Sequence, residues 1–161
     1  MKVAIIMGSH SDFDIVSKAE SILSQFGVAV EMRILSAHRT PMEVKDLVSS
    51  AEENGFEVII GAAGKAAHLP GVIASFTTLP VIGLPIKGGV MDGLDALLAI
   101  VQMPAGIPVA TVAVNGAENA GLLALHILSI KYPEISKQLK AYRAKMHDDV
   151  LEKDQTFGRV L

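Results

Sequence analysis

The 161-residue sequence contains no cysteine, which excludes disulfide bonds, thiolate metal sites and cysteine nucleophiles. It also lacks tryptophan, and only 4% of its residues are aromatic, although half of them are hydrophobic. The interior must therefore be built from Val, Ile, Leu, Ala and Met, which suit a buried parallel sheet. A chain of this length fits a single domain, which we place at residues 1–161.

No charge of one sign dominates the sequence, whose net charge is −3, and Lys and Arg form no cluster. We therefore expect no nucleic-acid partner, while a small phosphorylated ligand is compatible with this charge. No apolar run approaches the ~18 residues of a membrane span. The first run reaches Gly8 too soon for a signal peptide, so we expect a cytoplasmic protein with no membrane partner.

Five apolar runs rich in β-branched residues recur along the chain, at residues 3–7, 28–35, 58–63, 80–84 and 109–114. Each is followed by Gly, Ser or Asn and then by a helix-like stretch, a pattern typical of β-α-β units with a central parallel sheet. Right-handed crossovers bring the carboxyl ends of such strands to one edge, where open α/β sheets bind ligands. We therefore expect a ligand site in the loops that follow the strands.

Two helices are predicted with particular features. Thr40, Pro41 and Glu43 predict a helix start with an N-cap, a proline at the first helical position and a capping box. A long charged helix is predicted at residues 133–155, with one apolar stripe. The stripe consists of Ile135, Leu139, Tyr142, Met146 and Val150. No further strand remains to be covered, so we expect the stripe to pack on another subunit; packing on its own domain is the alternative.

The loop after the first run contains Gly8, Ser9, Ser11 and Asp12 and opens the first helix. Backbone N–H groups and the helix dipole favour an anion at such a position, which predicts a phosphate or ribose site. The alternative is that Ser11 or Asp12 is an ordinary N-cap, which accounts for one residue of the loop. The dinucleotide motif G-x-G-x-x-G is missing.

The loop after the second run places His38 beside Arg39. Histidine side chains exchange protons near neutral pH, and a guanidinium binds phosphate in a bidentate manner. Either residue alone could be an ordinary exposed loop residue. Their position at the carboxyl end of a strand favours a proton-transfer group next to a phosphate anchor.

The loop at residues 61–71 is rich in Gly and Ala, so its backbone could approach a ligand closely. His68 would then face the same edge; a tight turn with a solvated histidine is the alternative. Asp95 is interpreted as a helix cap rather than a site residue. We expect His126 to be a packed helix residue and His147 to be solvated.

Five short segments of this sequence, in this order, resemble the class I 5-(carboxyamino)imidazole ribonucleotide mutases of the PurE family. They are MGSHSD at 7–12, SAHRTP at 36–41, AAHLPG at 66–71, IVQMP at 100–104 and GIPVAT at 106–111. The resemblance covers nearly the whole chain. It implies a flavodoxin-like three-layer αβα sandwich, a homo-octamer, and a cofactor-free and metal-free isomerase of purine biosynthesis. The implied reaction converts 5-(carboxyamino)imidazole ribonucleotide into 4-carboxy-5-aminoimidazole ribonucleotide.

The resemblance also implies roles for individual residues. His38 matches the family's proton-transfer histidine and His68 the second catalytic histidine, at the base end of the ligand, while Arg39 would counter the phosphate. The other substrate-binding residues implied are Gly8, Ser9, Ser11, Asp12, Ser36, Ala37, Gly64, Lys65, Ala66 and Leu69.

The chain departs from the family pattern at Ala62 and Lys65, where the family usually has glycine. A side chain at a position that needs a positive φ is strained by ~1 kcal/mol or more, and Lys65 would add a cation near the site. Two alternative functions remain. One is direct carboxylation of aminoimidazole ribonucleotide by free carbon dioxide, and the other is a flavodoxin-like module that binds a nucleotide or flavin without catalysis.

Overall fold

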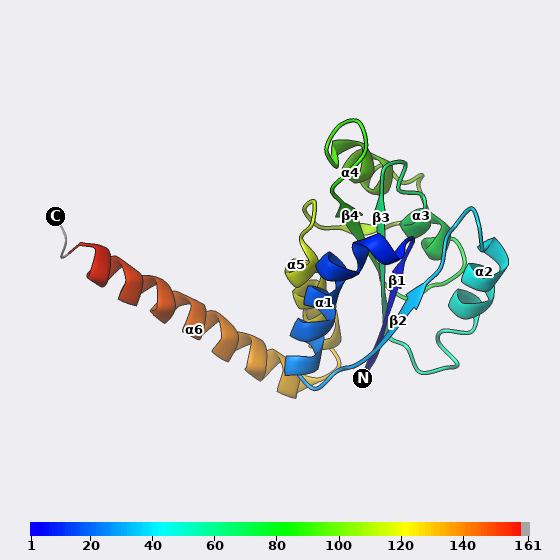
Figure 1. Ribbon diagram of the computed structural model, residues 1–161. Coiled ribbons are helices and arrows are strands. Elements are labelled where there is room, and N and C mark those ends of the chain that lie inside the picture. The colour runs from blue at the N-terminus through cyan, green and yellow to red at the C-terminus, as the bar shows by residue number, and fades with distance from the viewer. Residues whose placement is uncertain (159–161) are drawn as a thin grey trace.

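The computed structural model describes residues 1–158 and contains a five-stranded parallel sheet in the order β2-β1-β3-β4-β5 (Figure 1). The strands are β1 (Lys2–Met7), β2 (Ala29–Ile34), β3 (Val58–Gly64), β4 (Val81–Ile86) and β5 (Ala110–Thr111). This is the flavodoxin-like order, with its switch point between β1 and β3. The predicted fold class is confirmed.

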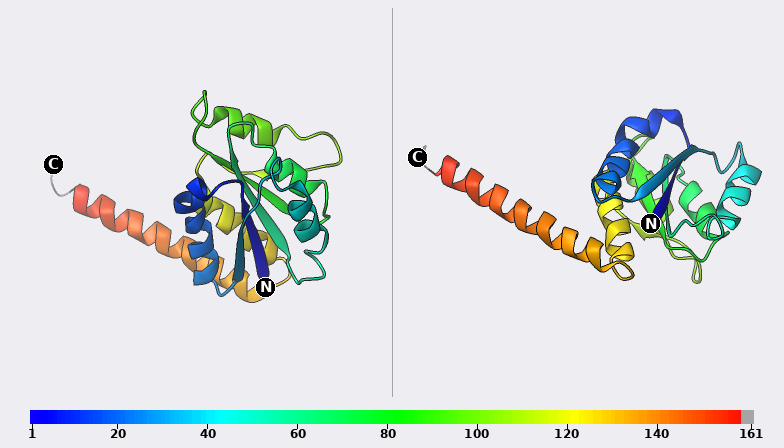
Figure 2. Two further views of the ribbon diagram at one scale, coloured as in Figure 1. Left: turned by 45° about the vertical axis from the view of Figure 1, so that its right-hand side comes forward. Right: turned by 90° about the horizontal axis from the view of Figure 1, so that it is seen from below.

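Helices cover both faces of the sheet, as the views in Figures 1 and 2 show. They are the 3-10 helix η1 (His10–Asp12), α1 (Phe13–Gln25), α2 (Pro41–Ser49), α3 (Leu69–Ala74), α4 (Leu94–Val101), α5 (Ala117–Leu128) and α6 (Pro133–Phe157). One buried cluster joins the sheet to α1, α5 and the start of α6, and the other joins it to α2, α3 and α4. The sheet is therefore the middle of three layers.

Small residues let the helices of the second cluster approach the sheet closely. Gly61 of β3 lies against Pro70 and Ile73 of α3. A side chain at Gly83 of β4 would collide with Ile100 of α4. These contacts bring the start of α3, and with it the loop that follows β3, tightly onto the carboxyl half of the sheet.

Strand β5 is shorter than the run 109–114 predicts, and β4 explains why. Val112 N donates to Gly83 O over 3.1 Å, but the next bond of a parallel ladder would need an N–H at position 85, which is proline. The chain then leaves the strand and turns at Val114 and Asn115, with Asn115 at φ 57°, and Asn115 N donates to Pro85 O. The apolar pattern of this run therefore comes from a short strand and the turn that follows it.

Helix α6 leaves the body of the domain, as Figures 1 and 2 show. Ile135 and Leu139 are buried, and the ring of Tyr142 packs on Phe26 with centroids 6.0 Å apart. Met146 and Val150 are 52% and 64% exposed. The predicted stripe is thus covered by its own domain at one end and uncovered at the other. In the described part of the chain, no helix is both long enough and apolar enough to cross a membrane.

Candidate active site

A cavity of about 640 Å³ lies at the carboxyl edge of the sheet. It is located at the switch point, where Gly8 N donates to Ala62 O over 3.2 Å and joins the end of β1 to β3. Every site residue named from the sequence lines this cavity. The loops that follow β1, β2 and β3 therefore converge on one space.

The first loop is organised by Ser9. Its Oγ accepts from Ser11 N over 3.3 Å, which makes Ser9 the N-cap of η1. The Ser11 hydroxyl lies 2.9 Å from Ser9 Oγ and 3.0 Å from Asp12 Oδ1. Asp12 stands at the N-cap of α1 but its side chain makes no cap bond. The capping alternative therefore holds for the position of Asp12 but not for its side chain, and the side chains of Ser11 and Asp12 both border the cavity.

The second loop is a turn closed by Ser36 and Thr40. Thr40 Oγ1 accepts from Ser36 N over 2.8 Å and donates to Ser36 O over 3.2 Å. Ser36 Oγ in turn accepts from the backbone N–H groups of His38 and Arg39. The predicted N-cap position of Thr40 and the proline at the start of α2 are confirmed. The predicted capping box is wrong, because the Thr40 side chain is engaged with Ser36 and makes no cap bond. The result is a fixed backbone under His38 and Arg39.

Arg39 reaches back over the first loop. Its Nη2 donates to Gly8 O over 2.9 Å, which places the guanidinium beside Ser9. A guanidinium carries five N–H donors, so four remain after this bond. The carbonyl of Gly8 thus orients a cation at the start of η1 and α1, where the helix end also favours an anion.

The two histidines are 30 residues apart in sequence but meet in the cavity. His38 Nε2 lies 2.8 Å from His68 Nδ1, and the rings are inclined by 75°. One nitrogen must donate and the other accept, and the tautomers decide which does so. Both side chains are exposed to the cavity, so the pair is accessible to a ligand.

The third loop is held by alternating buried and exposed residues. Ala67 is buried, His68 N donates to Ala66 O over 2.8 Å, and Leu69 is buried at the start of α3. Lys65 has φ 55°, so the strain expected there is confirmed. The same expectation for Ala62 is wrong, because Ala62 is a buried residue of β3, paired with Met7 and Leu84, outside the positive-φ region.

Four further residues line the cavity without having been predicted: Ala63, Ile86, Lys87 and Gly88. Strand β4 extends two residues beyond the predicted end at position 84, and the loop after it forms the remaining wall. The site-lining loops begin where the strands end. A strand end predicted at Ile86 would therefore have identified Lys87 and Gly88 as candidate site residues. The Lys87 ammonium lies 3.1 Å from Asp92 Oδ2.

Several other predicted residues lie outside this cavity. Asp95 is not the N-cap of α4, which is Gly93; its Oδ1 accepts from Ala96 N within the first turn. His126 is partly buried in α5, and His147 is exposed on α6, as expected. Among residues 1–158, no group of three or more His, Cys, Asp or Glu side chains could hold a metal ion.

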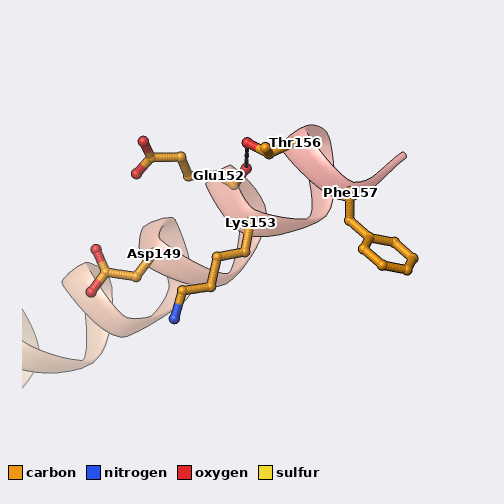
Figure 3. A pocket seen from close by; sticks show the side chains of 5 residues that line it. All are labelled: Asp149, Glu152, Lys153, Thr156 and Phe157. Carbon is orange, nitrogen blue, oxygen red and sulfur yellow. Dashed lines mark hydrogen bonds between the residues drawn. The ribbon is translucent and has the colours of Figure 1, made fainter. Parts of the chain in front are cut away.

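A second hollow, of about 590 Å³, runs along the last turns of α6. Figure 3 shows its lining, which consists of Asp149, Glu152, Lys153, Thr156 and Phe157. All five side chains come from one helix, and the Thr156 hydroxyl is bonded to the helix itself, at Glu152 O. One helix encloses no ligand, so the cavity at the sheet edge is the candidate site.

Residues 2–149 match the family model described as AIR carboxylase. The chain belongs to the AIR carboxylase family. It is 54% identical over 159 residues to the N5-carboxyaminoimidazole ribonucleotide mutase of Thermotoga maritima, covering 99% of this chain and 93% of that protein. It is 59% identical over 145 residues to the mutase of the same name from Pyrococcus abyssi, covering 90% of this chain and 83% of that protein.

The fold of the family is also that of this chain. The crystal structure of Treponema denticola PurE superposes with a TM-score of 0.88 at 31% identity, covering 96% of this chain and 97% of the other. The superposed region therefore includes nearly all of the sheet and its helices. The resemblance noted from the five sequence segments is confirmed.

Proposed function

We propose that this protein is an isomerase, an N5-carboxyaminoimidazole ribonucleotide mutase of de novo purine biosynthesis. Relatives that are 54% and 59% identical, over nearly the full chain, bear that name. The observation that carries the proposal is the meeting of His38, His68 and Arg39 at one cavity. A proton-transfer pair beside a phosphate anchor is what carboxylate migration on a ribonucleotide requires.

In the proposed complex, Arg39 and the start of η1 and α1 bind the phosphate. The guanidinium contributes charge, and the hydroxyls of Ser9 and Ser11 contribute hydrogen bonds. Asp12 offers carboxylate oxygens to the ribose hydroxyls. The backbone at Gly64 and Ala66, which carries no large side chain, lets the imidazole ring lie against the histidine pair.

The reaction needs one group that both gives and takes a proton. His38 protonates the exocyclic nitrogen as its bond to the carboxylate breaks, which releases carbon dioxide and leaves aminoimidazole ribonucleotide in the cavity. Ring carbon 4 then attacks the carbon dioxide, and His38 removes the proton from that carbon as aromaticity returns. His68, 2.8 Å from His38 Nε2, orients the ring that performs both transfers. The aminoimidazole supplies the electrons of the new bond, so the mechanism uses no cofactor or metal.

Two substrates distinguish the mutase from a carboxylase that uses free carbon dioxide. Purified protein is given either 5-(carboxyamino)imidazole ribonucleotide, without ATP, metal or biotin, or aminoimidazole ribonucleotide with bicarbonate. A mutase forms product from the first much faster than from the second, and the reverse result contradicts the proposal. A yellow protein that retains flavin and converts neither would instead favour the non-catalytic module.

The assembly is part of the same proposal. Met146 and Val150 on α6 are exposed, and so are Leu94, Leu98 and Val101 on α4. We propose that these surfaces pack on other copies of the chain in a cytoplasmic homo-octamer, with α6 lying on a neighbouring subunit. Light scattering should give the mass of eight chains, and a Val150→Lys variant should lower that mass. A wild-type monomer would contradict the assembly.

A further inference from the structure

Lys65 has an unusual backbone for a residue with a long side chain. Its φ of 55° lies in the left-handed region, which residues other than glycine rarely adopt. The loop is fixed on both sides of it, since Gly64 pairs with Ile86 in the sheet and Ala67 is buried. Strained backbone that its surroundings hold in place is concentrated at functional sites.

The stem of Lys65 lies beside the loop after β4. Gly89, at φ 76°, lies so close that a Cβ there would stand 3.4 Å from Lys65 Cγ and would collide with the Asp95 carboxylate. Only glycine allows this approach. Lys65 is exposed and lines the cavity, and the start of its side chain lies beside Gly89, so its ammonium is within reach of a ligand in the cavity.

The three cations that line the cavity differ in their partners. Arg39 is bound to Gly8 O, at the end of β1, and Lys87 is paired with Asp92. None of the ion pairs among residues 1–158 includes Lys65. Lys65 and Arg39 are therefore the two lining cations whose charge no carboxylate of residues 1–158 neutralises within 4.0 Å, and Arg39 is already bound to the Gly8 carbonyl.

The sheet order separates Lys65 from Arg39. Arg39 belongs to the loop after edge strand β2 and reaches the end of β1, whereas Lys65 follows β3 and lies beside the loop after β4. His68 comes three residues after Lys65 in the same loop. A ligand with its phosphate at Arg39 and its ring at the histidines therefore directs its far end toward Lys65.

We propose that Lys65 is a specificity-determining residue whose ammonium binds the carboxylate of the substrate and product, while Arg39 binds the phosphate. This inference rests on the proposed function. Aminoimidazole ribonucleotide has the same phosphate, ribose and ring but no carboxylate. Lys65 therefore distinguishes carboxylated ribonucleotides from the uncarboxylated one, and it retains the carboxylated ones more tightly.

The test measures equilibrium binding by calorimetry, with 4-carboxy-5-aminoimidazole ribonucleotide and aminoimidazole ribonucleotide as the two probes. Lys65→Met should weaken binding of the carboxylated probe about ten-fold or more, the usual effect of losing a charged hydrogen bond. Binding of the uncarboxylated probe should change by less than two-fold. Lys65→Gly, which suits the positive φ, should show the same selective loss, and Lys65→Arg should largely restore binding. Lys45→Met, on the exposed face of α2, is the control for removing one positive charge.

Each other outcome overturns the assignment in a recognisable way. Equal weakening of both probes would place Lys65 at the phosphate or give it only a structural role. Unchanged binding of the carboxylated probe to both Lys65→Met and Lys65→Gly would show that the ammonium does not contact the carboxylate. Wild-type protein that binds neither probe would overturn the proposed function, and the Lys65 assignment with it.

Discussion

The two edges of the sheet each carry a cluster of polar side chains, but the clusters differ in how their hydrogen-bonding groups are paired and how exposed they are. At the amino edge, the Glu57 carboxylate is 20% exposed and accepts hydrogen bonds from Lys131 Nζ at 2.7 Å and Tyr132 Oη at 2.8 Å. At the carboxyl edge, His38 and His68 are exposed and bonded to each other. Internally satisfied groups stabilise the fold, whereas exposed donors and acceptors around a cavity remain available to a ligand. Substitutions at the two edges should therefore affect different properties.

The largest expected effect is that of His38→Asn on catalysis. Asparagine preserves polarity and approximate size but cannot exchange a proton, so kcat should fall about 100-fold or more. The melting temperature should stay close to that of the wild type, because the side chain is exposed. His10→Asn is the matched control, since His10 lies at the same edge but does not line the cavity. Near wild-type turnover by folded His38→Asn would remove His38 from the reaction.

The next effect is that of Arg39→Ala on substrate binding. Loss of the guanidinium removes a charged contact to the phosphate, so KM should rise about ten-fold or more while kcat changes less. Steady-state kinetics on the carboxylated substrate measure this split. Arg33→Ala serves as the control, because Arg33 lies on edge strand β2 and pairs with Glu31 away from the cavity. An unchanged KM would show that the phosphate binds elsewhere.

At the amino edge, Glu57→Gln should reduce stability without reducing activity. The amide keeps the shape of the side chain but weakens the bonds from Lys131 and Tyr132, which should lower the free energy of unfolding by about 1 kcal/mol. Urea unfolding measures this change, and kcat should remain that of the wild type. Glu53→Gln, on the exposed turn before β3, is the control. A loss of activity with unchanged stability would reverse the distinction between the edges.

The smallest effect is the pH dependence of that stability difference. Burial raises the pKa of Glu57, but hydrogen bonds from Lys131 and Tyr132 outweigh it and lower the pKa below its ordinary value. A carboxylate with a lowered pKa in the folded state stabilises the fold fully above about pH 5 and loses this contribution as pH falls through the folded-state pKa. The difference between wild type and Glu57→Gln should therefore be full at pH 7 and shrink progressively as the pH falls below about 5. A constant difference across this range would show that the charge of Glu57 does not matter.

The fold could be predicted because its signals are local. Short β-branched runs mark the strands, and the residues after them mark the edge where the loops gather. Arrangements that depend on packing could not be predicted. The contact between His38 and His68 requires two loops to meet. The Thr40 side chain makes no cap bond to α2, because it is bonded to Ser36. Lys87 was missed because the prediction ended the strand before Pro85, whereas β4 continues through this proline to Ile86.

The contact between the two imidazoles has a consequence for how the resting protein meets its ligand. A bridge between Nε2 of one ring and Nδ1 of the other holds a single hydrogen, so the two rings take opposite parts at any moment. When one ring loses or gains that hydrogen, the other ring must change between hydrogen-bond donor and acceptor. The arriving molecule thus encounters one two-ring unit with a shared hydrogen, and a substitution in either ring alters the chemistry of both.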